Sequence, residues 1–400
     1  MKTLPVLLAM FGLAVAGAAV HVAQEISPIC PIDSRAFFEG RMRGCRLPGM
    51  AVAILRDGEI SWAEGFGKMD MSTGQPVTEE TLFHVASVSK TVTTVAVMQL
   101  AEEGEIDLDA PVDDLLSHAV RHPKHPDVPI TARMLLTHTG GVHDNWATYA
   151  MQYTLDDGGG DPKLAMSDVV EEYFDPNGLW YDVEENFLDG PPGTEHEYAN
   201  MGFALLGALV ETASGKTFTD YCHERIFAPL GMEKTAWLIA DVNEGQLAHP
   251  HDYNRGEYQV LPHYSYASIS DGALRTSVVE YARFLQAMMN GGIGANGTRI
   301  LEADTVAEMI APQIPEMSSS QGLGWSTCLT GWIDPERCES GGMPGHTGGD
   351  PGVFAVAFYA PPERSGAILF ANGSPRIDAG GALNLIAVMR RLVWELDLPE

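Results

Sequence analysis

Strand patterns stand at the two ends of this 400-residue chain, and helical patterns fill the stretch between them. The apolar run at 51–55, the turn Arg56-Asp57-Gly58-Glu59 and the segment 60–63 together predict a β-hairpin. Strand-like runs return at 353–359 and 367–370. We therefore expect one sheet built from both ends of the chain, with the helices inserted into it.

Apolar residues recur with a period near 3.6 over 88–103, and Gly104 follows as a C-cap. The other helical patterns cover 201–214, 278–290 and 382–396. The predicted fold class is α/β plus all-α, with two lobes: an antiparallel sheet flanked by helices, and a helical insertion lobe. We place the discontinuous α/β lobe at 33–82 and 322–400 and the mainly helical lobe at 83–321. The poorly periodic stretch 140–195 is expected to border a site.

The chain carries 24 Lys and Arg against 54 Asp and Glu, a formal net charge of −30. A surface this acidic repels phosphate backbones and anionic lipid, so nucleic acid is not an expected partner. It is typical of a soluble and salt-adapted surface. Lysine is scarce, which gives a lysine within a motif more weight.

The first 18 residues resemble a signal peptide. Lys2 precedes an apolar run from Leu4 to Val15, and Ala16-Gly17-Ala18 offers a cleavage site. We expect a periplasmic or secreted protein with no integral membrane span after cleavage. The alternative is an uncleaved N-terminal anchor.

Export permits disulfides among the five cysteines. Short spacing predicts a Cys328–Cys338 bridge and, on weaker grounds, Cys30–Cys45. Cys222 falls on an apolar helix face and is expected to be a buried thiol.

Several familiar motifs are absent or incomplete. Gly215-Lys216-Thr217 lacks the earlier glycine of a P-loop, since that position is Val210. No G-x-S-x-G occurs, which argues against the nucleophile elbow of an α/β-hydrolase. The pairs His138 with His143-Asp144, and His249 with His251-Asp252, fit no known ligand spacing. We predict no metal and no cofactor, and interpret these histidines as solvated loop residues.

Ser87-Val88-Ser89-Lys90 opens the helix at 88–103. A spacing of three places Ser87 and Lys90 on one helix face. A serine hydroxyl needs a base to take its proton, and a desolvated lysine can do so because burial disfavours its charged form. Backbone N–H groups at the helix start favour a developing oxyanion. The alternative is an N-cap serine beside a surface lysine.

Two further elements follow along the chain. Tyr198-Ala199-Asn200 precedes the helix at 201–214, where a tyrosine can relay a proton and an asparagine can hold a substrate amide. The segment His346-Thr347-Gly348-Gly349 stands before the strand at 353–359, where small residues let an extended substrate lie along a strand edge. Taken singly, these are equally a packed tyrosine, an N-cap asparagine and a common turn.

Ser-x-x-Lys, Tyr-x-Asn and His-Thr-Gly in this order resemble the penicillin-binding protein and serine β-lactamase superfamily, over roughly residues 33–398. Other segments similar to that superfamily are Pro48–Ala53, Leu135–Gly141, Met201–Gly207 and Ala282–Leu285 leading to Gly291-Gly292.

The resemblance implies a two-lobed fold with the site between the lobes, and a role for each motif residue. Ser87 would be the acylated nucleophile and Lys90 its base. Tyr198 would shuttle a proton to the leaving group and activate the deacylating water. The backbone N–H groups of Ser87 and Gly349 would form the oxyanion hole.

The substrate-binding residues implied by the resemblance are Asn200, His346, Thr347 and Gly348. His346 stands where β-lactamases usually carry lysine, a variant similar to secreted D,D-peptidases. An imidazole with an ordinary pKa near 6.5 is mostly neutral at pH 7 and gains charge toward pH 5.5. It would offer a weaker field to a substrate carboxylate, so efficient penicillin hydrolysis is not expected.

We therefore expect an exported serine hydrolase that acts through an acyl-enzyme on peptide or amide bonds of small peptides. The alternatives are a small-acyl esterase or weak β-lactamase with the same site residues, and a non-catalytic β-lactam or peptide sensor. The sequence leaves the natural substrate and the oligomeric state open.

Overall fold

The structure, a computed structural model, describes residues 34–116, 119–340, 342–375 and 378–395. The predicted signal peptide, 1–18, and Cys30 lie outside these residues. Among the described helices, none is both long enough and apolar enough to cross a bilayer.

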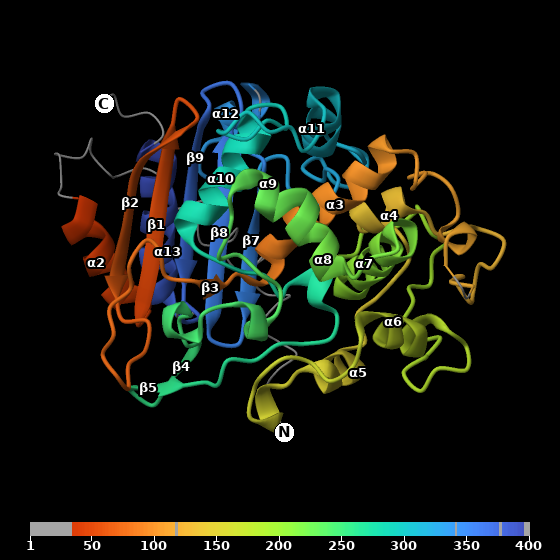
Figure 1. The fold of residues 1–400 in the computed structure, drawn as a ribbon, viewed down its shortest axis with the longest axis horizontal. Helices are drawn as coiled ribbons and strands as arrows, with labels where there is room; N and C mark the ends of the chain where they lie inside the picture. The colour runs from red at the N-terminus through yellow and green to blue at the C-terminus, as the bar shows by residue number, and fades with distance from the viewer. Residues whose placement is uncertain (1–33, 117–118, 341, 376–377, 396–400) are drawn as a thin grey trace.

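One antiparallel sheet joins the two ends of the chain (Figure 1). Its strand order is β2-β1-β9-β8-β7, and the predicted hairpin is confirmed as β1 and β2. The N-terminal and C-terminal parts meet where β1 pairs with β9, from Met50 opposite Ala371 to Leu55 opposite Gly366. The five strands are β1 (Gly49–Arg56), β2 (Glu59–Gly67), β7 (Gly345–Asp350), β8 (Val353–Ala360) and β9 (Ser365–Ala371).

The central strands β1, β8 and β9 are almost entirely apolar, and they are buried on both faces of the sheet. Along β1, the even-numbered residues from Met50 to Ile54 belong to one hydrophobic core, and the odd-numbered residues from Ala51 to Leu55 belong to the other. This division follows from the period of two in a strand. Helices α2 (Ser34–Cys45) and α13 (Ala379–Glu395) pair with each other and contribute Phe38 and Leu392 to the first core.

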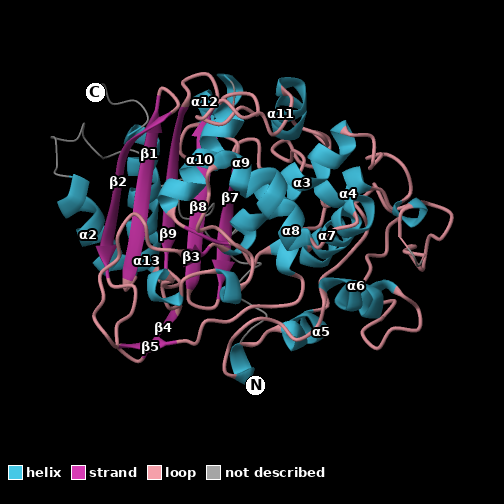
Figure 2. Cartoon of the chain, in the orientation of Figure 1, coloured by secondary structure: helices cyan, strands magenta, loops and turns pink. Residues whose placement is uncertain are grey.

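The opposite face of the sheet is covered by α10 (Val278–Met289), which contacts β1, β2, β8 and β9. Helix α10 lies inside the range 83–321 that we assigned to the helical lobe, so this range also supplies a helix to the sheet. The predicted helices at 88–103, 201–214 and 382–396 correspond to α3 (Lys90–Glu102), α7 (Asn200–Ser214) and α13. Helices α3 and α7 pack together beside the sheet (Figure 2).

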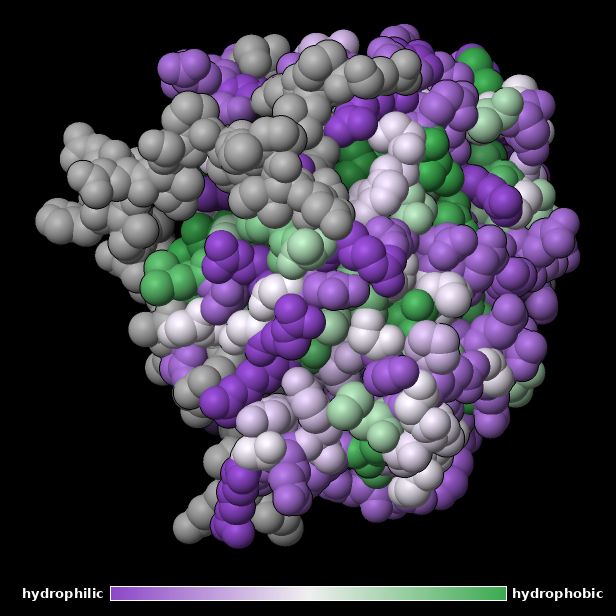
Figure 3. All heavy atoms as spheres, turned by 90° about the vertical axis from the view of Figure 1, so that its left-hand side faces the viewer, coloured by the Kyte–Doolittle hydropathy of each residue, from purple (hydrophilic) through white to green (hydrophobic). Residues whose placement is uncertain are grey.

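Shorter elements complete the described fold. The helices are α4 (Ala132–Leu136), α5 (Trp146–Tyr149), α6 (Met166–Phe174), α8 (Phe218–Cys222), α9 (Ala228–Leu230), α11 (Ala303–Ile310) and α12 (Pro335–Ser340). Two small ladders pair β3 (Phe83–His84) with β6 (Arg275–Thr276) and β4 (His251–Asn254) with β5 (Glu257–Val260). Where it is described, the face at the β2 end of the sheet is largely polar (Figure 3), in keeping with the acidic composition.

The cysteines behave as expected wherever they are described. Cys328 and Cys338 form a disulfide with Cα atoms 5.5 Å apart. Cys222 is a buried thiol at the end of α8. Cys45 is also buried, but the expected Cys30–Cys45 bridge involves a residue outside the described ranges.

Peptide mapping of the protein without reductant should recover Cys328 and Cys338 in one linked pair and Cys222 as a thiol. Burial raises the pKa of Cys222 above its usual range, so this thiol should resist alkylation until the protein is unfolded. The same digest after reduction is the control. Recovery of both Cys328 and Cys338 as thiols from unreduced protein would contradict the bridge.

Candidate active site

The turn that carries Ser87 is a short 3₁₀ helix, η1 (Ala86–Ser89), which runs directly into α3. Ala86 has a φ of +47°, a left-handed conformation that costs free energy in a residue other than glycine. The Ser89 hydroxyl donates to the Ala86 carbonyl at 2.6 Å and accepts the Leu274 N–H at 3.1 Å. Ser89 therefore fixes the turn, while Ser87 stays half-buried at its surface.

Lys90 is fully buried, and its Nζ contacts three oxygen atoms. Nζ lies 2.7 Å from Asn200 Oδ1, 2.5 Å from the Asp271 carbonyl and 3.2 Å from Ser87 Oγ. The first two are carbonyl oxygens, which can only accept. Ser87 is the one partner of the three that can donate. A neutral Lys90 amine would thus spend its two N–H groups on the carbonyls and direct its lone pair at the Ser87 hydroxyl.

Two aromatic rings also lie near the Lys90 amine. Nζ lies 5.0 Å from the ring centre of Tyr198 and 5.4 Å from that of Phe203. The faces of such rings attract cations. Tyr198 is 39% exposed, so its ring reaches from the buried amine to solvent.

Asn200, the first residue of α7, is held between Lys90 and a buried carboxylate. Its side-chain N–H donates to Asp144 at 2.8 Å, while its Oδ1 accepts from Lys90. Asp144 also accepts the backbone N–H groups of Asn200 and Met201, both at 2.9 Å. An acidic side chain at these N–H groups stabilises the start of a helix. The expected contact of Asn200 with substrate stays a prediction, since both ends of its amide already have protein partners.

The segment His346–Gly349 does not form a turn but belongs to β7, the edge strand of the sheet. A Cβ atom on Gly348 would lie 2.2 Å from the Val85 carbonyl oxygen and 3.2 Å from the Ser87 nitrogen. Glycine is thus what lets the strand approach the turn that carries Ser87 so closely. A Cβ on Gly349 would meet nothing within 4 Å, and Thr347 is exposed. The open side of β7 therefore lies next to Ser87.

His346 needs a correction to the pKa expected from sequence. Burial, and to a smaller extent the nearby Lys90, lower its pKa to about 4. The ordinary value near 6.5 is therefore wrong for this side chain, and the imidazole is neutral throughout pH 5.5–7.5. The sequence did not show this because it does not show that His346, half-buried on β7, lies near Lys90.

Three site residues were not recognised from sequence. Asp144 was weighed only as a loop residue near a histidine, and Asp271 had no motif at all. His138 packs its ring on Tyr198, with ring centres 4.4 Å apart, and its Nδ1 accepts the Ala199 N–H at 3.2 Å. Burial, together with Lys90, holds the pKa of His138 well below its usual range, so it is a neutral support for Tyr198. These contacts join segments far apart in the chain, and no local pattern signals them.

Metal ligation was considered for the histidines. Across the residues that the structure describes, no group of three or more His, Cys, Asp or Glu side chains is arranged to hold a metal ion. His249 instead stacks on His263, with ring centres 3.8 Å apart, and His251 bonds to the Met71 N–H at 3.2 Å.

Comparison with known sequences decides the family. The sequence model of the beta-lactamase family matches residues 35–388, a range that contains Ser87, Lys90, Tyr198 and β7. The chain belongs to the beta-lactamase family. It is a serine hydrolase of the superfamily that also contains the penicillin-binding proteins, and its two-lobed fold is the one that the resemblance implied.

Individual relatives of this beta-lactamase family member carry different names. Penicillin-binding protein 4 of Amycolatopsis lactamdurans is 28% identical over 337 residues, which are 82% of this chain and 81% of that protein. Esterase EstB of Burkholderia gladioli is 31% identical over 216 residues, about half of each chain (52% and 51%). The solved D-amino acid amidase from Ochrobactrum anthropi SV3, in complex with L-phenylalanine amide, has a TM-score of 0.69 and 20% identity. That match covers 91% of this chain and 97% of the amidase, and it shows a shared fold.

The approach of β7 to Ser87 can be tested with two glycine substitutions. Gly348→Ala should lower kcat/KM for a small p-nitrophenyl ester by about 10²-fold, because the new Cβ pushes β7 away from Val85. Gly349→Ala is the matched control for stability, and its Tm should stay close to that of the wild type because its Cβ meets no protein atom. Wild-type kcat/KM in Gly348→Ala would show that the reaction does not need this close approach.

Proposed function

We propose that this chain is an exported serine hydrolase that forms an acyl-enzyme on Ser87 and cleaves amide bonds of small peptides, in the manner of a D,D-peptidase or a D-amino-acid peptidase. The observation that carries the proposal is the buried Lys90 amine, 3.2 Å from Ser87 Oγ and otherwise bonded to two carbonyl oxygens. That arrangement suits a base whose only proton donor is the Ser87 hydroxyl.

The reaction begins when Ser87 Oγ bonds to the substrate carbonyl carbon and its proton passes to Lys90 Nζ. The charge on the carbonyl oxygen is met by the N–H groups of Ser87 and Gly349. The new Lys90 ammonium faces the rings of Tyr198 and Phe203. The carbon–nitrogen bond then breaks, and the amine leaves with a proton relayed through Tyr198. Water next attacks the acyl ester, loses a proton to the same relay, and releases the acid and Ser87.

Amide substrates suit this site better than esters for a chemical reason. An amine must gain a proton as it leaves, whereas a phenolate leaves without one. Tyr198 connects the buried amine of Lys90 to the exposed side of the site and so supplies a route for that proton. The D-amino acid amidase, a protein named for amide chemistry, shares the fold.

The second candidate function is a small-acyl esterase, favoured by the 31% identity to esterase EstB. It would use the same nucleophile and base. A sensor that binds a β-lactam or a peptide without turnover would keep Ser87 acylated, and this outcome can be distinguished by experiment. The disulfide between Cys328 and Cys338 supports export to the periplasm or the medium, because such bonds persist in oxidising compartments.

A fluorescent acylating probe, read by intact-protein mass spectrometry, tests the proposed function. Ser87→Ala should abolish labelling and lower turnover at least about 10³-fold. Ser89→Ala should keep labelling but lower the Tm, because Ser89 holds the turn through Ala86 and Leu274. Loss of labelling in Ser89→Ala with normal labelling of Ser87→Ala would place the nucleophile at residue 89 instead.

The lifetime of the adduct separates the candidates. The turnover of a D-alanyl peptide and of a p-nitrophenyl ester is measured, and the background turnover of each in Ser87→Ala is subtracted. A transient adduct together with faster turnover of the peptide supports the peptidase. Faster ester turnover favours the esterase, and a persistent adduct with every substrate indicates a sensor.

His346→Lys tests what a permanent cation would do on β7. Since burial leaves His346 neutral down to a pKa of about 4, its charge should not alter wild-type activity between pH 5.5 and 7.5. His346→Lys should raise kcat/KM for a cephalosporin relative to a neutral p-nitrophenyl ester by about tenfold, through attraction of the carboxylate. His346→Gln is the neutral control and should leave this ratio unchanged. A parallel loss with both substrates in folded His346→Lys would remove any electrostatic role for this position.

A further inference from the structure

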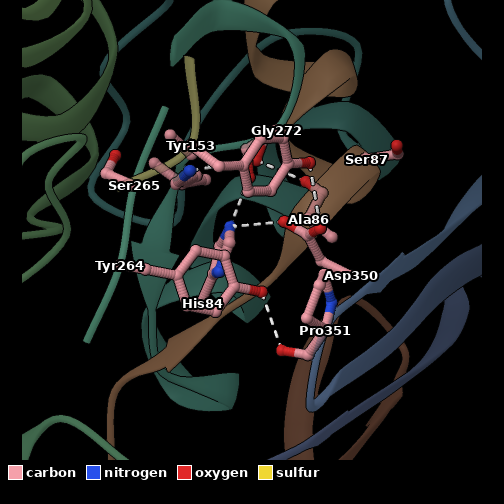
Figure 4. A network of polar contacts seen from close by, with 12 residues as sticks. His84, Ala86, Ser87, Tyr153, Tyr264, Ser265, Gly272, Asp350 and Pro351 are labelled. Carbon is pink, nitrogen blue, oxygen red and sulfur yellow. Dashed lines mark hydrogen bonds and ion pairs between the residues drawn. The ribbon is translucent and has the colours of Figure 1, made fainter. Parts of the chain in front are cut away.

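A buried polar cluster lies behind the site, at the end of β7 (Figure 4). Asp350, the last residue of β7, follows Gly349 directly, and its side chain is only 4% exposed. The Tyr153 hydroxyl donates to Asp350 Oδ1 at 3.0 Å. Asp350 Oδ2 lies 3.8 Å from His84 Nε2 and has no hydrogen-bond partner among the described residues.

His84 ties this cluster to the turn of the nucleophile. It is the last residue of β3, two positions before Ala86, and β3 leads straight into η1. Its Nε2 donates to the Gly272 carbonyl at 3.0 Å, while its Nδ1 is buried without a hydrogen-bond partner in the described structure. Burial, and after it the charge of Arg275, keep the pKa of His84 well below its usual range. His84 is therefore a neutral donor.

The other groups around Asp350 come from three segments, and they decide its charge. They are Tyr153, Tyr264, Tyr266, Asp271 and Arg275. Tyr264 donates to the Pro351 carbonyl at 2.8 Å, and the Arg275 guanidinium donates to the Trp237 and Tyr264 carbonyls at 2.5 and 2.6 Å. Burial raises the pKa of Asp350 to about 8, and the nearby Asp271 adds to the rise. Asp350 is thus a neutral acid at pH 7.

Gly349 stands between two anchored neighbours. On one side Gly348 packs against the Val85 carbonyl. On the other side Asp350 accepts the hydrogen bond from Tyr153 and lies beside His84, which belongs to the strand leading into the same turn. Gly349 itself has open space where a side chain would be. The two contacts hold its backbone without filling the space beside Ser87.

We propose that Asp350, held by its hydrogen bond from the Tyr153 hydroxyl, is a positioning residue that fixes the Gly349 N–H relative to Ser87 and so keeps the two halves of the oxyanion hole in register. The proposal rests on the proposed function, because that function assigns the Gly349 N–H to the oxyanion. Asp350 acts through the backbone and touches no substrate. A neutral side chain of the same shape should serve as well, and a charged one should not.

The sign of the pH effect follows from the two pKa values of Asp350. An aspartate in an unfolded chain has a pKa of about 3.9, and the pKa of Asp350 in the folded protein is about 8. The folded protein therefore binds an extra proton between these values, and this group makes stability fall as pH rises through about 4 to 8. Above pH 8 the carboxylate forms with Oδ2 lacking a donor, which should loosen the end of β7.

Asp350→Asn and Asp350→Ala, made in the full chain, test the proposal. Asp350→Asn cannot ionise, so its Tm relative to the wild type should rise steadily between pH 5 and 8.5. Its kcat for a p-nitrophenyl ester should also fall less than that of the wild type between pH 7 and 9. Asp350→Ala should lower kcat at pH 7 about tenfold or more, with KM changed less than about threefold, because the oxyanion donor shifts without loss of a substrate contact.

Asp127→Asn, at an exposed position, is the matched control and should leave both pH profiles unchanged. If Asp350→Ala does not fold, Tyr153→Phe replaces it, since this variant removes only the hydroxyl that bonds to Asp350.

Two results would overturn the positioning role. One is a Tm difference between Asp350→Asn and the wild type that does not change with pH. The other is a normal kcat in Asp350→Ala or Tyr153→Phe while the probe still labels Ser87. Absence of probe labelling in the wild type would instead refute the proposed function, and the role of Asp350 in the oxyanion hole with it.

Discussion

The site depends on one buried nitrogen atom, Nζ of Lys90. Its three oxygen partners come from three separate elements: η1 with Ser87, α7 with Asn200, and the short turn η8 (Ile269–Asp271) with the Asp271 carbonyl. An amine buried without partners would cost several kcal/mol, so packing these elements together is a condition for placing Lys90 here at all. The helical lobe is thus assembled around the amine that we propose as the base for Ser87.

The charges near Lys90 are arranged so that none of the nearest partners is a carboxylate. Asp144 is reached only through the Asn200 amide, and Asp271 offers its backbone carbonyl to Lys90 while its side chain accepts from Tyr149 at 3.0 and 3.1 Å. Burial raises the pKa of Asp271 to about 7 and that of Asp144 above its usual value. A carboxylate in direct contact would hold the lysine as an ammonium ion. Contacts with neutral oxygen atoms alone suit the role of base that we propose for Lys90.

Local patterns were sufficient for much of this arrangement and insufficient for the rest. Sequence predicts the hairpin of β1 and β2 and the helices α3, α7 and α10. Each of these elements shows itself in the spacing of apolar residues that lie close together in the chain. The spacing of Ser87 and Lys90 likewise needs only one helical turn. Asp144 and Asn200, by contrast, are joined across loops, and His138 reaches Tyr198 in the same way. The strand-edge position of β7 was expected from the order of the motifs and not from periodicity, because its glycines and threonine taken alone resemble a turn until β8 pairs with them.

That weak strand pattern is itself required by the position of β7. An edge strand exposes unpaired backbone groups and invites association with other chains. Here the strand has only six residues, and Pro344 and Pro351, which cannot donate to a ladder, stand directly before and after it. The edge is therefore confined to Gly345–Asp350, and its first residue, Gly345, already exchanges two backbone hydrogen bonds with Ser326. Gly348 permits the close approach of β7 to Val85, and Asp350 holds the C-terminal end of the strand through Tyr153. The residues that give β7 a weak strand pattern in the sequence are therefore the same residues that keep its edge open for the extended substrate of the proposed function.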